Sequence, residues 1–216
     1  LGRSRPGDVD GAERLRHLRR DQGQMLIASN FVSDSLQWGI RSDAGFRTGS
    51  PNPTGAGALT HNGPPRSLRE PNINNWLPGI VIANNVVVQS GTGGILFSGD
   101  VPPGGTATVG PVPVGRILNN TIVGNPNNRL GVGIQVEQNS SPTLLNNVVA
   151  DLVTGVSVDA SSIALGTVIG GTLYRNNGTD AATGALGLGS FPISLNATDP
   201  LFVDQTRRNY YPAPLS

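Results

Sequence analysis

Two acidic residues, Glu137 and Asp159, have the types and spacing that could support chemistry. Each ends a short stretch in which apolar and polar residues alternate, GIQVE and GVSVD. If these stretches are neighbouring strands, their backbones lie about 4.8 Å apart, with both carboxylates in one outward column. Glycoside hydrolysis uses carboxyl pairs separated by roughly 5–9.5 Å. Glu137 and Asp159 are therefore candidate substrate-binding residues, and the alternative is that they are surface acids at strand ends with no fixed partner.

Other groups that catalysis or metal binding would use are scarce. The chain has no cysteine, and all fifteen of its basic residues are arginine. Neither His17 nor His61 lies in the repeated segments described below. A Gly-x-Ser-x-Gly motif, a phosphate-binding loop and a metal-ligand triplet are all missing from the sequence. We therefore expect no catalytic residue, no metal and no cofactor, and we favour a non-enzymatic role over an enzyme whose site the loops or neighbouring domains complete.

A recurring phrase predicts the elements that carry the two acids. It is an apolar segment, a small polar pair and a second apolar segment, and its copies start at unequal intervals, as expected of stacked repeats with loop insertions. The second polar residue is expected at a tight corner with positive or near-bridge φ, because Asn and Gly tolerate that region. Stacked amides at this corner should bond from repeat to repeat. The corner residues are Asn30, Asn85, Asn120, Asn147 and, in a fifth copy, Gly171.

Two apolar columns should flank this corner and form the core. One column lies three residues before the corner and the other two residues after it. The first consists of Ile27, Ile82, Ile117, Leu144 and Val168, and the second of Val32, Val87, Ile122, Val149 and Leu173.

Another strand follows in four of the copies, and each begins at a glycine. The alternation that follows each glycine indicates one buried face and one outward face. The inward pairs are Ile40/Ser42, Ile95/Phe97, Ile134/Val136 and Val156/Val158, and the outward pairs are Arg41/Asp43, Leu96/Ser98, Gln135/Glu137 and Ser157/Asp159.

The phrases GRILNNTIVGN, GVGIQVEQNSSPTLLNNVVAD and TGVSVDASS resemble repeats of the right-handed parallel β-helix superfamily, which includes pectate-lyase-like enzymes and bacterial surface proteins. The tail DPLFVDQTRRNYYPAPLS is similar to the closing segment of large secreted β-helix proteins of planctomycete type. The resemblance implies an all-β, right-handed parallel β-helix (a solenoid) over residues 24–216. The Asp-Asp pair and the Gly-His-Gly of polygalacturonase-like members are missing, which weakens the enzymatic alternative.

The remaining segments are expected to cap the solenoid or to leave it. Residues 1–23 form an N-terminal cap or linker, in which Asp10 and Glu13 have the form of a capping box before a short helix over residues 11–20. Loop insertions are expected at about residues 45–78 and 102–113, because both stretches are rich in Gly and Pro.

Composition narrows the partners and the function. Charged residues make up 13% of the 216 residues, and the net charge is +1, so no overall field attracts nucleic acid. No stretch approaches the roughly 18 apolar residues of a membrane span. We expect a structural or adhesive module of a larger secreted or cell-surface bacterial protein, with copies of itself or neighbouring domains of the parent chain as partners. The alternative is a carbohydrate-active β-helix, a lyase, hydrolase or glycan-binding relative, whose partner is a polysaccharide.

Overall fold

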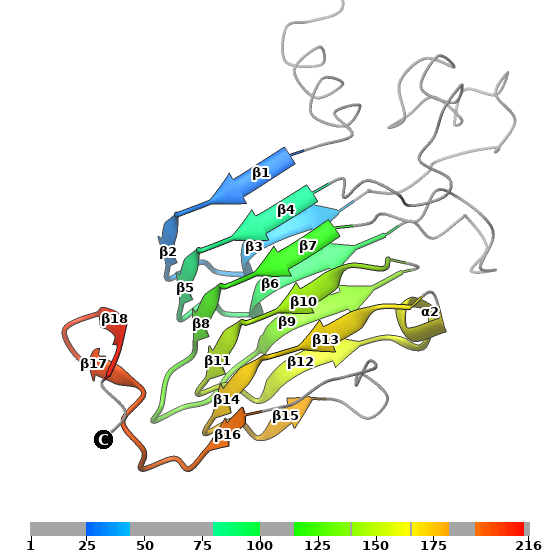
Figure 1. The fold of residues 1–216 in the computed structure, drawn as a ribbon. Helices are drawn as coiled ribbons and strands as arrows, with labels where there is room; N and C mark the ends of the chain where they lie inside the picture. Colours follow the sequence, from blue (N-terminus) through cyan, green and yellow to red (C-terminus); the bar gives the residue numbers. More distant parts are fainter. Residues whose placement is uncertain are drawn as a thin grey trace, which may run out of the picture.

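The protein is an all-β structure of three parallel sheets that the chain visits in turn (Figure 1). It is seen here in a computed structural model, which describes residues 25–43, 80–99, 115–138, 140–164, 166–181 and 193–213. Each three-strand repeat contributes one strand to sheet A, one to sheet B and one to sheet C. Every strand of a sheet pairs in parallel with its neighbours, so the repeats stack on one another.

The strands are short, and those of sheet C are generally the longest. Sheet A contains β1 (Met25–Ala28), β4 (Ile80–Ala83), β7 (Gly115–Leu118), β10 (Thr143–Leu145) and β13 (Val168–Gly170). Sheet B contains β2 (Phe31–Ser33), β5 (Val86–Val88), β8 (Thr121–Val123), β11 (Val148–Ala150), β14 (Leu173–Arg175) and β16 (Ile193–Leu195). Sheet C contains β3 (Trp38–Asp43), β6 (Gly93–Ser98), β9 (Val132–Glu137), β12 (Thr154–Val158) and β15 (Thr179–Ala181).

The pairing register confirms the predicted alignment of the first four repeats. Ile27 pairs with Ile82, and Ile82 with Ile117, as the recurring phrase requires. In sheet B, Val87 pairs with Val32 and with Ile122.

The alignment of the fifth repeat is wrong by one residue. Leu144 pairs with Ile169, and Val149 with Tyr174. Val168 is 36% exposed, whereas Ile169 and Tyr174 are buried. The repeat is displaced because Gly171, with φ of 57°, takes the first corner position and not the second.

One core draws on all three sheets. The inward residues of sheets A and B pack with those of sheet C in a single apolar cluster. All eight predicted inward residues of sheet C are buried. The strand glycines are required by this packing, because a Cβ on Gly94 would lie 2.3 Å from Ile122 and one on Gly133 would lie 2.5 Å from Val149.

The corner between sheets A and B has the predicted residues but not the predicted backbone. The left-handed residue is the first member of each polar pair, at Ser29, Asn84, Asn119 and Asn146, with φ between 54° and 59°. The second member, predicted to have this conformation, instead turns its amide into the interior. Asn85, Asn120 and Asn147 are at most 1% exposed.

These buried asparagines form the predicted ladder between repeats. The Oδ1 of Asn120 accepts from the backbone N–H of Asn85 at 3.0 Å and from its Nδ2 at 3.0 Å. The Nδ2 of Asn120 donates in turn to the Ile82 carbonyl and to the Oδ1 of Asn147. Asn30 makes the same contacts to Asn85 at the start of the ladder.

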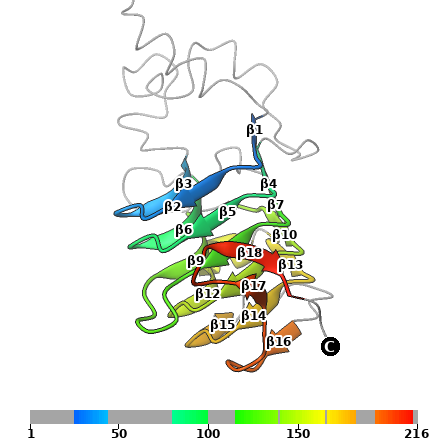
Figure 2. The same cartoon turned by 90° about the vertical axis from the view of Figure 1, so that its left-hand side faces the viewer.

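A C-terminal hairpin, which the sequence analysis did not predict, covers the outer face of sheet B (Figure 2). It consists of the antiparallel strands β17 (Phe202–Asp204) and β18 (Asn209–Pro212). Leu201 and Phe202 are buried against Val123 and Ala150 in a second apolar cluster. The outer face of this sheet is therefore occupied by the chain itself.

The predicted N-terminal cap and both predicted insertions lie outside the described residues. The described residues contain one helix, α2 (Ala160–Ala164), which follows β12. None of the described helices has the length and apolar character needed to cross a membrane.

Candidate functional site

Asp159 is held by the fold at the start of helix α2. Its Oδ1 accepts one hydrogen bond from the backbone N–H of Ser162 and one from the hydroxyl of Ser161, each at 2.8 Å. Its Oδ2 accepts from the backbone N–H of Gln138 at 2.8 Å. Desolvation by burial raises the pKa of Asp159, but these hydrogen bonds outweigh it and hold the pKa below its ordinary value. The carboxylate acts as a helix N-cap that also ties two repeats together.

Glu137 lies in the outward column predicted for it. The column has its predicted register, since Ser98 pairs with both Asp43 and Glu137, and Asp159 follows the last residue of β12. The Oε2 of Glu137 accepts from the Nε2 of Gln135 at 2.7 Å. Glu137 and Asp159 are half-buried and hydrogen-bonded, unlike the partnerless surface acids expected of a structural chain. Their proposed binding of substrate stays a prediction.

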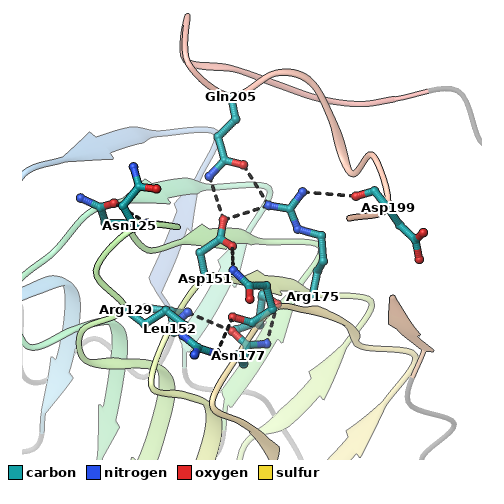
Figure 3. A network of polar contacts seen from close by, with 11 residues as sticks. Asn125, Arg129, Asp151, Leu152, Arg175, Asn177, Asp199 and Gln205 are labelled. Carbon is teal, nitrogen blue, oxygen red and sulfur yellow. Dashed lines mark hydrogen bonds and ion pairs between the residues drawn. The ribbon is translucent and has the colours of Figure 1, made fainter. Parts of the chain in front are cut away.

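A buried ion pair between the fourth and fifth repeats is linked to the C-terminal hairpin through Gln205 (Figure 3). Asp151, with a fully buried side chain, lies 2.9 Å from the guanidinium of Arg175. Gln205 of the hairpin accepts from Arg175 at 3.0 Å and donates to Asp151 at 2.8 Å. Asn176 donates to the other oxygen of Asp151 at 2.8 Å. Both carboxylate oxygens of Asp151 thus have partners. Because Gln205 bonds to both members of the ion pair, the network holds the hairpin in place.

The far end of the hairpin reaches the first repeat. Arg208 lies 3.3 Å from Asp34, the residue that follows β2. The ring of Tyr210 lies 6.3 Å from Phe31 and 5.4 Å from Phe202, edge-on to the latter. The hairpin thus runs across sheet B from the fifth repeat to the first.

Two adjoining cavities lie at the corner between sheets B and C, where the hairpin ends. The first has a volume of about 360 Å³, and its walls include Leu36, Gln89, Ser90, Gly91, Asn128 and Leu130. The second has a volume of about 430 Å³, and its walls include Gln89, Asn125, Asn127, Gln205, Arg208 and Tyr210. Because they share Gln89 and Asn125, we treat the two cavities as one groove, called the corner groove below.

A glycine at position 91 and the loop between β8 and β9 shape the corner groove. A Cβ on Gly91 would lie 2.4 Å from the Leu36 carbonyl oxygen, so the floor must carry a glycine. The loop between β8 and β9 forms one wall. It is folded by a hydrogen bond from the Asn127 N–H to the Asn125 side chain, at 2.9 Å, and held to the fifth repeat by Arg129, which donates to the Asn176 carbonyl at 3.4 Å.

Neither the buried ion pair nor the corner groove was among the sequence predictions. Asp151 follows an apolar strand, as many solvent-exposed corner residues do, and its partner Gln205 is 54 residues away. The one available signal was position, since Asp34, Gln89 and Asp151 all follow a strand of sheet B and share positive φ. That regularity predicts a corner, but not the cover over it.

Among the described residues, no group of three or more His, Cys, Asp or Glu side chains could hold a metal ion. Comparisons with protein-family models, with curated proteins and with solved structures found no match to this chain.

Proposed function

We propose that the protein is a structural or adhesive module with a right-handed parallel β-helix fold, part of a larger secreted or cell-surface bacterial protein. The observation that carries this proposal is that the ordered polar side chains serve cohesion between repeats. The asparagine ladder, the Asp159 cap and the Asp151–Arg175 pair each join different repeats. The stability of a module of this kind is spread over many small, similar interfaces between repeats.

The topology supports the β-helix part of the proposal. Successive strands enter sheets A, B and C in order through five repeats, and one core fills the space between the sheets. Parallel strands joined by crossovers are right-handed in almost all known cases.

Location and parentage rest on the resemblance of the C-terminal segment to closing segments of large secreted β-helix proteins. In this chain that segment forms the hairpin that covers sheet B. A closing segment that folds back over the repeats would protect apolar residues on the outer face of one sheet of an extracellular rod. Neighbouring domains and copies of the chain are the proposed partners.

The enzymatic alternative is tested by assaying neutral and uronate-containing polysaccharides for new reducing ends and for unsaturated-uronate absorbance. The wild-type chain is compared with a Glu137→Gln, Asp159→Asn double variant. A structural module gives no turnover in either protein. Turnover by the wild type that disappears in the double variant, while its circular dichroism is retained, would establish an enzyme and refute the proposal.

A further inference from the structure

We propose that the corner groove binds a neutral oligosaccharide. The inference rests on the proposed function, to which it adds a location and a ligand class for adhesion. The two cavities share Gln89 and Asn125, and their volumes of about 360 Å³ and 430 Å³ are typical of small-ligand sites.

The hydrogen-bonding groups of the corner groove match a polyol. Gln89, Asn127 and Asn128 present carboxamides that form no side-chain hydrogen bond with another described residue. Each carboxamide offers both a donor and an acceptor, as a sugar hydroxyl does.

The charge of the corner groove favours a neutral ligand. Asp34 lines the first cavity and Arg208 the second, and the two are paired with each other at 3.3 Å. The groove therefore offers no unpaired charge from these two residues to select an acidic or a basic ligand.

The corner groove also has apolar walls, which suit a sugar because the faces of a sugar ring present C–H groups. Leu36 is 95% exposed and Leu130 is 53% exposed, and both line the first cavity beside the glycine floor at Gly91. The half-buried ring of Tyr210 lines the second cavity. Apolar side chains beside a few hydrogen-bonding groups are the usual lining of a small-ligand site.

The test is affinity electrophoresis of the whole chain in gels that contain xylan, galactomannan, hydroxyethylcellulose or starch, with polygalacturonate as the acidic comparator. The groove variant is Gln89→Gly with Asn128→Ala. Glycine suits position 89 because Gln89 has φ of 51°. The matched control is Asn119→Gly, which removes an exposed carboxamide at the other corner, where φ is 54°.

We expect at least one neutral polymer to retard the wild type and the Asn119→Gly control equally. The groove variant should bind about tenfold more weakly, because two hydrogen-bonding side chains are lost. Thermal unfolding of all three proteins verifies that each is folded. Retardation by none of the neutral polymers, retardation by polygalacturonate alone, or equal retardation of the groove variant would each overturn the inference. Such a failure leaves the structural proposal standing, since that proposal depends on the turnover assay.

Discussion

At the scale of single residues, the asparagine ladder turns a costly buried group into a bond between repeats. A buried amide without partners destabilises a protein by several kcal/mol, whereas a satisfied one contributes modestly. The side chain of Asn120 bonds at once to the N–H and Nδ2 of Asn85, to the Ile82 carbonyl and to the Oδ1 of Asn147. Its side chain thereby selects one alignment of neighbouring repeats.

Replacing Asn120 by alanine should therefore destabilise the protein by about 3 kcal/mol or more, because several buried polar groups lose their partners together. The matched control is Asn30→Ala at the exposed start of the ladder, which should cost about 1 kcal/mol. Urea denaturation of both variants measures the difference. Equal midpoints for the two variants would show that burial adds nothing to the ladder.

Asp159 should make the stability depend on pH. Because its pKa is lowered in the folded state, it stabilises the fold above the ordinary carboxyl pKa of about 3.9, and this contribution is lost as the pH falls through the folded-state pKa. Asp159→Ala should cost about 1 kcal/mol at pH 7, as loss of an N-cap does. Thermal unfolding at pH 7 and near pH 2 should show a difference from wild type that disappears at the lower pH. A Glu137→Ala control, which removes no backbone contact, should unfold like the wild type at both pH values.

At the scale of elements, the two ion pairs near the hairpin of β17 and β18 differ in burial. The Asp151–Arg175 pair is buried and bonds to Gln205 of the hairpin, whereas the Asp204–Arg207 pair lies within the hairpin itself. The Arg175 side chain is 11% exposed and that of Asp151 is fully buried, whereas Arg207 next to Asp204 is 87% exposed. The aromatic ring of Phe202 also lies 5.8 Å from the guanidinium of Arg175. Burial, more than the number of pairs, should decide which contact holds the hairpin.

Arg175→Ala should destabilise the protein by about 3 kcal/mol, because it leaves the buried charge of Asp151 with amide partners only. Arg207→Ala should change the stability by less than about 0.5 kcal/mol, since a surface pair contributes little. Chemical denaturation followed by circular dichroism compares the two variants. Similar free energies of unfolding would place the hairpin's stability elsewhere, in the apolar contacts of Leu201 and Phe202.

The register of sheets A and B was predictable over four repeats because one shared core dictates the two apolar columns. The fifth repeat was not, since glycine can occupy either corner position and the apolar Val168 and Ile169 both fit the pattern. The two candidate acids, Glu137 and Asp159, were placed in the correct column from the alternation of apolar and polar residues alone. Their hydrogen-bond partners, the hairpin and the corner groove depend on contacts between distant segments, which a local pattern does not encode.

At the scale of the whole molecule, the three sheets have different surroundings. Sheet B is covered by the hairpin, which shields Val123 and Ala150 from solvent. Sheet C has the outward acids, and the corner between these two sheets has the groove. The hairpin is thus a cover for an apolar face and one wall of the corner groove at the same time.

Release of the hairpin should make the protein self-associate. In the full chain, a Phe202→Ala, Tyr210→Ala double variant removes the two rings that pack the hairpin onto sheet B, and it should destabilise the protein by about 2–4 kcal/mol. The exposed apolar face then offers a surface for other copies, as contiguous apolar patches do. Light scattering after size-exclusion chromatography should show a mass that rises with concentration, together with increased binding of a hydrophobic dye. Tyr211→Ala, at a side chain 77% exposed on the same strand, is the control and should behave like the wild type. A double variant that stays folded with unchanged mass and no dye binding would show that the outer face of sheet B needs no cover.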